Sequence, residues 1–148
     1  MAAQFGVQAP GVTPRFNIAP TQQTLIVREG GAGTREFATV RWGLIPSWAK
    51  DKKIGNSLIN ARAETLARRP AFRDALLRRR CLIPADGFYE WQRQPRGRRL
   101  PFYVRSRDGE PFGLAGLWDV WHSPQGERVA SCTIITTAAN AVVAPVHE

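Results

Sequence analysis

The chain has little of what most metal-binding, disulfide-linked and membrane proteins require. It contains only two cysteines, Cys81 and Cys132, and only two histidines, His122 and His147. Neither cysteine stands in a metal-ligand spacing, which disfavours both a structural zinc site and a disulfide framework. No signal peptide is recognisable, and no apolar run approaches the ~20 residues of a membrane span. We therefore expect a cytoplasmic protein with no metal, no cofactor and no membrane contact.

Lysine is also scarce. Only three of the 21 basic residues are lysine and the rest are arginine, against 12 acidic residues, which gives a net charge of +9. The planar guanidinium of arginine suits phosphate oxygens and stacks on bases, so the composition favours a polyanionic partner. A GC-rich genome would produce the same arginine bias, and this alternative stays open.

The 148 residues, 43% of them hydrophobic, suffice for one globular domain, which we expect to be monomeric. One amphipathic helix is predicted from Pro70 to Arg80 with Phe72, Leu76 and Leu77 facing inward, and another helix is predicted to begin within residues 138–143. Strands are predicted over residues 24–28, 36–42, 81–84, 87–92, 101–105, 112–121 and 129–137. The fold class is therefore α+β, a single domain of mainly antiparallel β-sheet curled into a barrel-like core with a few flanking helices.

Two loop segments carry rigid or aromatic residues beyond what a plain sheet requires. Asn17-Ile18-Ala19-Pro20-Thr21 precedes a strand, and Trp42-Gly43-Leu44-Ile45-Pro46-Ser47-Trp48 follows one. Trp48 stands in a loop after a proline and beside a basic stretch, which is typical of a base-stacking platform. A tryptophan lid over the core is the alternative.

Two further segments carry polar residues at strand spacing. Alternation would place Asn60, Arg62 and Glu64 on one face, either lining a cleft or simply solvated. In Asp86-Gly87-Phe88-Tyr89-Glu90-Trp91, the carboxyl of Glu90 lies between two aromatics, where desolvation would suit general acid–base work. Glu90 could equally point to solvent on the face that it shares with Gln92.

Taken together, these segments are specific. The order and spacing of N-x-A-P-T, W-G-L-I-P-x-W, N-A-R-A-E-T and A-D-G-F-Y-E-W closely resemble the SOS response-associated peptidase family. The later I-I-T-T-A-A-N segment and His147 fit the same pattern, so the resemblance covers residues 15–148. It implies a DNA-damage-response protein, associated with the nucleoid, that binds abasic sites in single-stranded DNA.

The resemblance also implies a chemistry. In the family, the α-amine of an N-terminal cysteine forms a Schiff base with the ring-opened abasic aldehyde, and the thiol closes it to a thiazolidine. Autocatalytic removal of the initiator methionine exposes that cysteine, which accounts for the hydrolase, protease and lyase-type activities. Carried over by motif, Asn60 would orient the nucleophile, Glu90 would act as general acid–base, and His147 would stabilise the opened sugar. The residues implied to line the DNA path, with Arg62 holding a phosphate, are Pro20, Thr21, Trp48, Arg62 and Thr136.

The chain departs from the family pattern at both ends. The family begins Met-Cys-Gly-Arg, whereas this sequence begins Met1-Ala2-Ala3. We expect a family domain over residues 1–148 that lacks roughly the first twenty residues and the C-terminal part of the pattern. Cys81 and Cys132, expected to be small buried hydrophobes, cannot replace an N-terminal cysteine, because thiazolidine closure needs amine and thiol on one residue.

Two other functions remain to be weighed against crosslinking. The first is a catalytically dead, basic module that binds single-stranded nucleic acid, which this chain resembles in charge and tryptophan content. The second is a conventional hydrolase built on Glu90 and His147, which the sequence disfavours because no serine, metal or internal cysteine nucleophile accompanies them.

Overall fold

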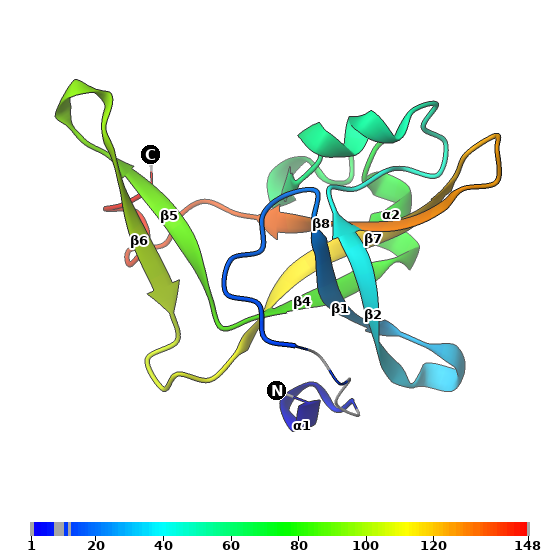
Figure 1. Cartoon of the computed structure of the whole chain (residues 1–148), viewed down its shortest axis with the longest axis horizontal. Coiled ribbons are helices and arrows are strands. Elements are labelled where there is room, and N and C mark those ends of the chain that lie inside the picture. The colour runs from blue at the N-terminus through cyan, green and yellow to red at the C-terminus, as the bar shows by residue number, and fades with distance from the viewer. Residues whose placement is uncertain (1, 8–10, 12, 148) are drawn as a thin grey trace.

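The computed structural model describes residues 2–7, 11 and 13–147, and within them strands predominate (Figure 1). Two α-helices and four 3-10 turns accompany eight strands in this described part. The helical elements are α1 Ala2–Phe5, η1 Gly31–Gly33, η2 Lys52–Ser57, η3 Ala63–Thr65, α2 Arg73–Arg78 and η4 Pro95–Gly97. The strands are β1 Gln23–Glu29, β2 Arg35–Trp42, β3 Asn60–Arg62, β4 Arg80–Ala85, β5 Gly87–Arg93, β6 Arg99–Arg105, β7 Phe112–His122 and β8 Arg128–Thr136.

Five strands close into a small barrel. They follow the order β2-β1-β4-β7-β8, and β8 returns to pair with β2. The four pairings along this order are antiparallel, as are most pairs in the described structure, whereas β2 and β3 both run parallel to β8. The predicted α+β domain with a mainly antiparallel, barrel-like sheet is confirmed.

The barrel interior follows the period-2 pattern of its strands. Side chains at alternate positions point inward and form one cluster of buried residues: Ile26, Val40, Cys81, Ile83 and Cys132. A second cluster lies beneath α2 and the loops around it: Leu44, Leu58, Ala61, Leu66, Phe72, Ala75 and Leu117. The two cysteines are thus buried hydrophobes, as the sequence predicted.

Both helix predictions overestimated the helical part of the chain. Helix α2 spans only Arg73–Arg78, because residues 65–72 form successive turns and Arg80 already pairs with Leu117 in β4–β7. Phe72 and Ala75 are buried in the core and Leu76 packs against it, whereas Leu77 is 74% exposed, so its predicted inward orientation was wrong. Residues 141–146 form turns where a second helix was expected.

Two glycines allow β2 to lead into the following loop. Gly43 has φ +127, and a β-carbon on it would lie 2.5 Å from the carbonyl oxygen of Gly55. A β-carbon on Gly55 would lie 2.6 Å from the carbonyl oxygen of Gly43. Only glycine at both positions permits this contact, which brings residues 43–49 against the barrel.

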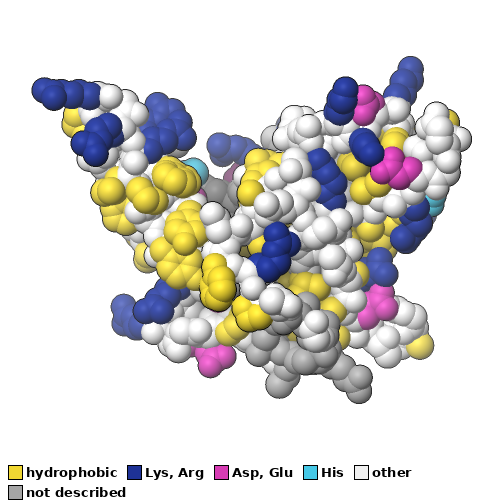
Figure 2. Space-filling model, viewed as in Figure 1, with side chains coloured by type: hydrophobic (Ala, Val, Ile, Leu, Met, Phe, Trp, Pro, Cys, Tyr) yellow, Lys and Arg dark blue, Asp and Glu magenta, His cyan; other side chains and the backbone are white. Residues whose placement is uncertain are grey.

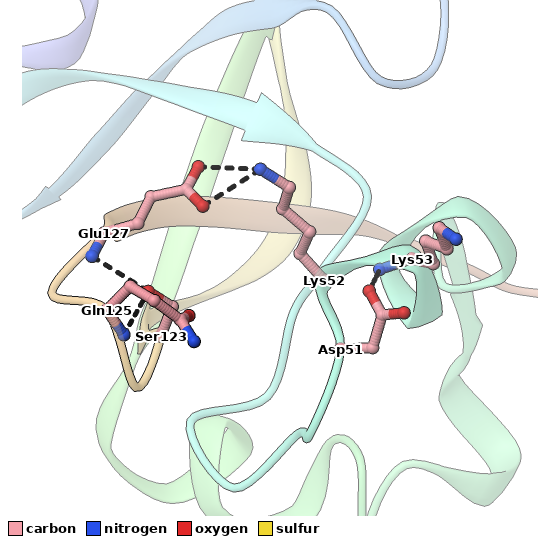
Figure 3. A network of polar contacts seen from close by, with 6 residues as sticks. All are labelled: Asp51, Lys52, Lys53, Ser123, Gln125 and Glu127. Carbon is pink, nitrogen blue, oxygen red and sulfur yellow. Dashed lines mark hydrogen bonds and ion pairs between the residues drawn. The ribbon is translucent and has the colours of Figure 1, made fainter.

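The segment after this loop is tied to the β7–β8 turn (Figure 3). Lys52 Nζ lies 2.8 and 2.9 Å from the two carboxylate oxygens of Glu127, and the Asp51 side chain accepts a hydrogen bond from the Lys53 amide. The Ser123 hydroxyl accepts hydrogen bonds from the amides of Gln125 and Glu127, which fixes the turn. Because the ion pair is exposed, it contributes at most about 1 kcal/mol, and its role is to set the geometry of the loop.

Strands β5 and β6 form a separate hairpin that projects from the barrel (Figure 1). Their register pairs Gly87 with Arg105, Tyr89 with Tyr103 and Arg93 with Arg99. The chain leaves β8 and runs back along this hairpin, so that the end of the described chain lies beside β5 (Figure 1). The hairpin therefore has the barrel on one side and residues 137–147 near the other.

Candidate functional site

A cleft of about 880 Å³ lies between the barrel and the hairpin. Figure 2 shows hydrophobic side chains along the projecting hairpin, next to the hollow between the hairpin and the barrel. Four of the sequence segments singled out above contribute to its lining: residues 17–20, Trp42, residues 86–89 and Ile134. Segments far apart in the sequence therefore meet at one surface.

One face of the hairpin supplies the aromatic wall of this cleft. Tyr89, Trp91 and Tyr103 line the cleft and remain about half exposed. The rings of Tyr89 and Tyr103, directly opposite each other, lie 5.2 Å apart between centroids. Trp91, which belongs to one of the motifs, and Tyr103 were given no role in the site from the sequence, although the alternation of aromatic residues along both strands could have placed them on one face.

The motif glycine of the hairpin is explained by this wall. A β-carbon on Gly87 would lie 2.4 Å from Cζ of the Tyr103 ring, so the phenol occupies the space that a side chain would need. Partial desolvation of the half-exposed phenol, together with the nearby Asp86 carboxylate, raises the pKa of Tyr103. Asp86 and Gly87 together hold the tyrosine at the cleft.

The opposite face of the hairpin brings two predicted catalytic residues together. His147 Nδ1 lies 3.1 Å from Glu90 Oε2, although 57 positions separate the two residues. Nearby, Gln92 Nε2 donates to the carbonyl oxygen of Pro145 at 2.8 Å, which holds the C-terminal segment against the strand. The Glu90 side chain is 25% exposed and therefore does not point to open solvent. A carboxylate and an imidazole in contact can pass a proton between them.

Asn60, Arg62 and Thr136 lie at a different edge. Parallel pairing of β3 with β8 sets Arg62 beside Thr136 and Asn60 beside Ile134, a lining residue of the cleft. Asn60 and Arg62 are both exposed, with Ala61 buried between them, as strand alternation predicted. Glu64 does not share their face, because the strand ends at Arg62 and residues 63–65 form a 3-10 turn.

The remaining residues implied to line the DNA path fall in two places. Pro20 lines the cleft. Thr21 adopts φ 73 and donates its amide to the carbonyl of Trp42 at 2.7 Å, a left-handed conformation that is uncommon for a β-branched residue. Trp48 lies outside the cleft and is 55% exposed, so it is not part of the core.

The structure thus places Glu90 next to His147, and Arg62 next to Thr136. Within residues 13–147, neither Asn60 nor Arg62 makes a side-chain hydrogen bond to Glu90 or His147. The two pairs stand at the two ends of the segment 137–147, which runs from the end of β8 to the hairpin (Figure 1). The convergence of Asn60, Arg62 and Glu90 on one substrate remains a prediction.

The cysteines are poor nucleophiles here. Cys81 and Cys132 are 8% and 0% exposed. Burial raises the pKa of Cys132 to about 12, and burial with the nearby Cys132 raises the pKa of Cys81 further still. A thiol that keeps its proton and is closed to solvent does not react as a nucleophile.

Within the described ranges, no group of three or more histidine, cysteine, aspartate or glutamate side chains could hold a metal ion. No helix in that same part of the chain is long and apolar enough to cross a membrane.

Comparison with known proteins shows which proteins the chain resembles. It is 44% identical to the abasic site processing protein YoqW of Bacillus subtilis (strain 168) over 135 residues, which cover 91% of this chain and 60% of that protein. It is 29% identical over 171 residues to the abasic site processing protein HMCES of Rattus norvegicus, covering 91% of this chain and 48% of that protein. The chain therefore spans 60% or less of the length of these two relatives.

A solved structure agrees with these relatives. A crystal structure of a protein from Bacteroides thetaiotaomicron superposes with a TM-score of 0.78 at 29% identity, covering 85% of this chain and 54% of that one. The family description "SOS response associated peptidase (SRAP)" matches residues 1–148 of the sequence. The chain belongs to the SOS response associated peptidase family.

Proposed function

We propose that this chain binds abasic sites in single-stranded DNA and supplies groups that process them. The observation that carries the proposal is the contact between Glu90 and His147, two residues that the family resemblance assigns to one reaction and that lie 3.1 Å apart. The names of the relatives, abasic site processing proteins, and the net charge of +9 support the same substrate.

In the reaction that the family resemblance implies, the α-amine of an N-terminal cysteine attacks the aldehyde carbon of the ring-opened abasic sugar to give a carbinolamine. Loss of its hydroxyl as water yields the imine, and that hydroxyl must be protonated to leave. Glu90 would donate this proton, and His147 at 3.1 Å would replenish it and contact the opened sugar. Asn60, exposed on β3, would orient the attacking amine.

The DNA path proposed here uses the exposed residues of the barrel edge. Arg62 would pair with a phosphate and Trp48 would stack on a base, with a stacking contribution of roughly 1–3 kcal/mol. The DNA strand would also contact three residues beside the cleft, Pro20, Thr21 and Thr136, of which Pro20 forms part of the cleft wall.

The second candidate function is DNA binding without crosslinking. The burial of both cysteines favours it. Neither Cys81 nor Cys132 can close a thiazolidine, because each is buried and carries no free α-amine. The same burial excludes a peptidase reaction that uses either thiol.

Fluorescence anisotropy tests the binding proposal. A labelled single-stranded 10-mer with a central natural abasic site should bind more tightly than the corresponding duplex, and its affinity should fall steeply between low and physiological salt. Equal affinity for single strand and duplex, or an affinity independent of salt, contradicts the proposal.

Denaturing electrophoresis separates the two candidates. After incubation with abasic single-stranded DNA, the chain as given should yield no shifted band in the absence of borohydride. A version extended upstream to begin Met-Cys-Gly-Arg should yield a stable band, and Glu90→Gln should slow its formation by roughly a hundredfold or more. Glu110→Gln, at an exposed glutamate of a turn, is the matched control. A stable band from the chain as given would show that an internal cysteine reacts.

A further inference from the structure

Trp48 is exposed, yet the backbone on both sides of it is fixed. The amide of Ser47 donates to Asp119 Oδ2 at 3.0 Å. The carbonyl of Ala49 accepts from the indole nitrogen of Trp121 at 2.7 Å. The amide of Ala49 also bonds to the carbonyl of Pro46 at 2.9 Å, which closes the turn beneath the ring. The two residues that flank Trp48 are therefore anchored, while its ring is exposed and open to a ligand.

Both anchors come from one face of one strand. Asp119 and Trp121 stand two positions apart on β7 and are 5% and 4% exposed. The Asp119 carboxylate is itself held, since its Oδ1 accepts from the Val120 amide at 2.7 Å and lies 3.2 Å from Arg79 Nε. Because both side chains are buried behind the loop, they can affect a bound ligand only by holding Trp48 in position.

Fixing the loop lowers the cost of stacking. A base that binds a mobile ring must order the ring and its loop, and this loss of conformational freedom subtracts from affinity. A ring whose flanking residues are already hydrogen-bonded to a barrel strand avoids most of that loss.

We propose that Asp119 and Trp121 are positioning residues that hold Trp48 in place for a nucleic-acid base. This inference rests on the proposed function, because it takes the same single strand as the ligand and Trp48 as its stacking platform. It adds two residues of β7 to which neither motif nor resemblance assigned a role.

A double-mutant cycle tests the proposal. Trp121→Phe removes the indole donor but keeps an aromatic ring, and Trp118→Phe is the matched control on the same strand, with its ring against Arg28. We expect Trp121→Phe to weaken the binding of a labelled oligothymidine 10-mer by about two- to tenfold, the effect of one hydrogen bond. The salt dependence should not change, because no phosphate contact is lost.

The effect must also depend on the ring that is positioned. In a Trp48→Ala background, Trp121→Phe should have no further effect on affinity. Equal weakening in both backgrounds, equal weakening by Trp118→Phe, or no weakening at all overturns the positioning role.

Amide hydrogen exchange without DNA keeps this inference separate from the proposed function. In Asp119→Ala, which removes both carboxylate oxygens, the Ser47 amide should exchange faster while the β7–β8 ladder remains protected. Unchanged protection at Ser47 overturns the inference whatever the DNA result. A Trp48→Ala variant that binds DNA as well as the parent chain would instead refute the stacking role in the proposed function.

Discussion

Replacing Gly87 by alanine should displace the Tyr103 ring in the aromatic wall of the cleft and lower the stability of the protein. The new β-carbon would lie 2.4 Å from Cζ and 2.5 Å from the hydroxyl oxygen of Tyr103. Carbon atoms in contact stand about 3.5–4.0 Å apart, so the ring must retreat by roughly 1 Å or more. Tyr103 is 48% exposed and can swing outward, but it then loses its interaction with Asp86 and its packing in the aromatic wall. We expect Gly87→Ala to lower the free energy of unfolding by about 1–3 kcal/mol.

Urea denaturation of four variants measures this cost. Gly31→Ala is the control, because a β-carbon there meets no atom within 4 Å, and it should leave the midpoint unchanged. In a Tyr103→Ala background, Gly87→Ala should cost almost nothing, since the ring that it displaces is absent. The same cost with and without Tyr103, or no cost in the parent chain, would refute the steric explanation.

Three further changes have outcomes that follow from single observations. Thr21→Gly should raise the free energy of unfolding by up to about 1 kcal/mol, because φ 73 strains a β-branched residue; unchanged urea stability would contradict this. Burial raises the pKa of Cys132 to about 12. The unfolded chain therefore releases this proton first, and stability should decline as pH rises above about 8.5. Cys132→Ala should reduce that decline in thermal melts and leave the part that Cys81 contributes. Arg62→Gln should reduce the salt slope of single-strand binding by about 0.7, whereas exposed Arg107→Gln should not.

The barrel could be predicted because its strands bury every second side chain. On β4, Cys81 and Ile83 are buried while Arg80 and Leu82 are exposed, and on β1 the alternate residues Thr24 and Ile26 are buried. The closing parallel contact between β2 and β8 leaves no such pattern in the sequence. It depends on tertiary packing, including the approach of Gly43 to Gly55.

The helix at residues 70–80 shows where periodicity misleads. The apolar spacing fits a helix of three turns, but pairing of Arg80 with β7 ends it after Arg78. The hydrogen bonds of the β4–β7 ladder continue where a longer helix would have interrupted them. Tertiary pairing therefore overrode local propensity, and Leu77 was left in solvent.

The candidate site could be predicted only in part. Alternation along the hairpin left the direction of Glu90 open, because either face of a two-stranded ribbon can be solvated. The answer depends on the segment 137–147, which lies against that face and brings His147 within 3.1 Å. Trp91 and Tyr103 were missed for a related reason: their spacing is that of any strand, and only the projection of the hairpin makes them a cleft wall.

The position of His147 follows from one polar side chain in the last motif. Asn140 Oδ1 accepts the amides of Val142 and Val143, and its carbonyl accepts the amide of Ala144. Such side-chain bonds let asparagine compete with helix formation and reverse the chain in a tight turn. A second turn follows, in which the His147 amide bonds to the carbonyl of Val143. The expected helix is thereby replaced by two turns, which, with the bond from Gln92 to Pro145, set His147 against Glu90. The proposed proton-transfer pair therefore depends on local turn chemistry and one hairpin contact, and not on the barrel core.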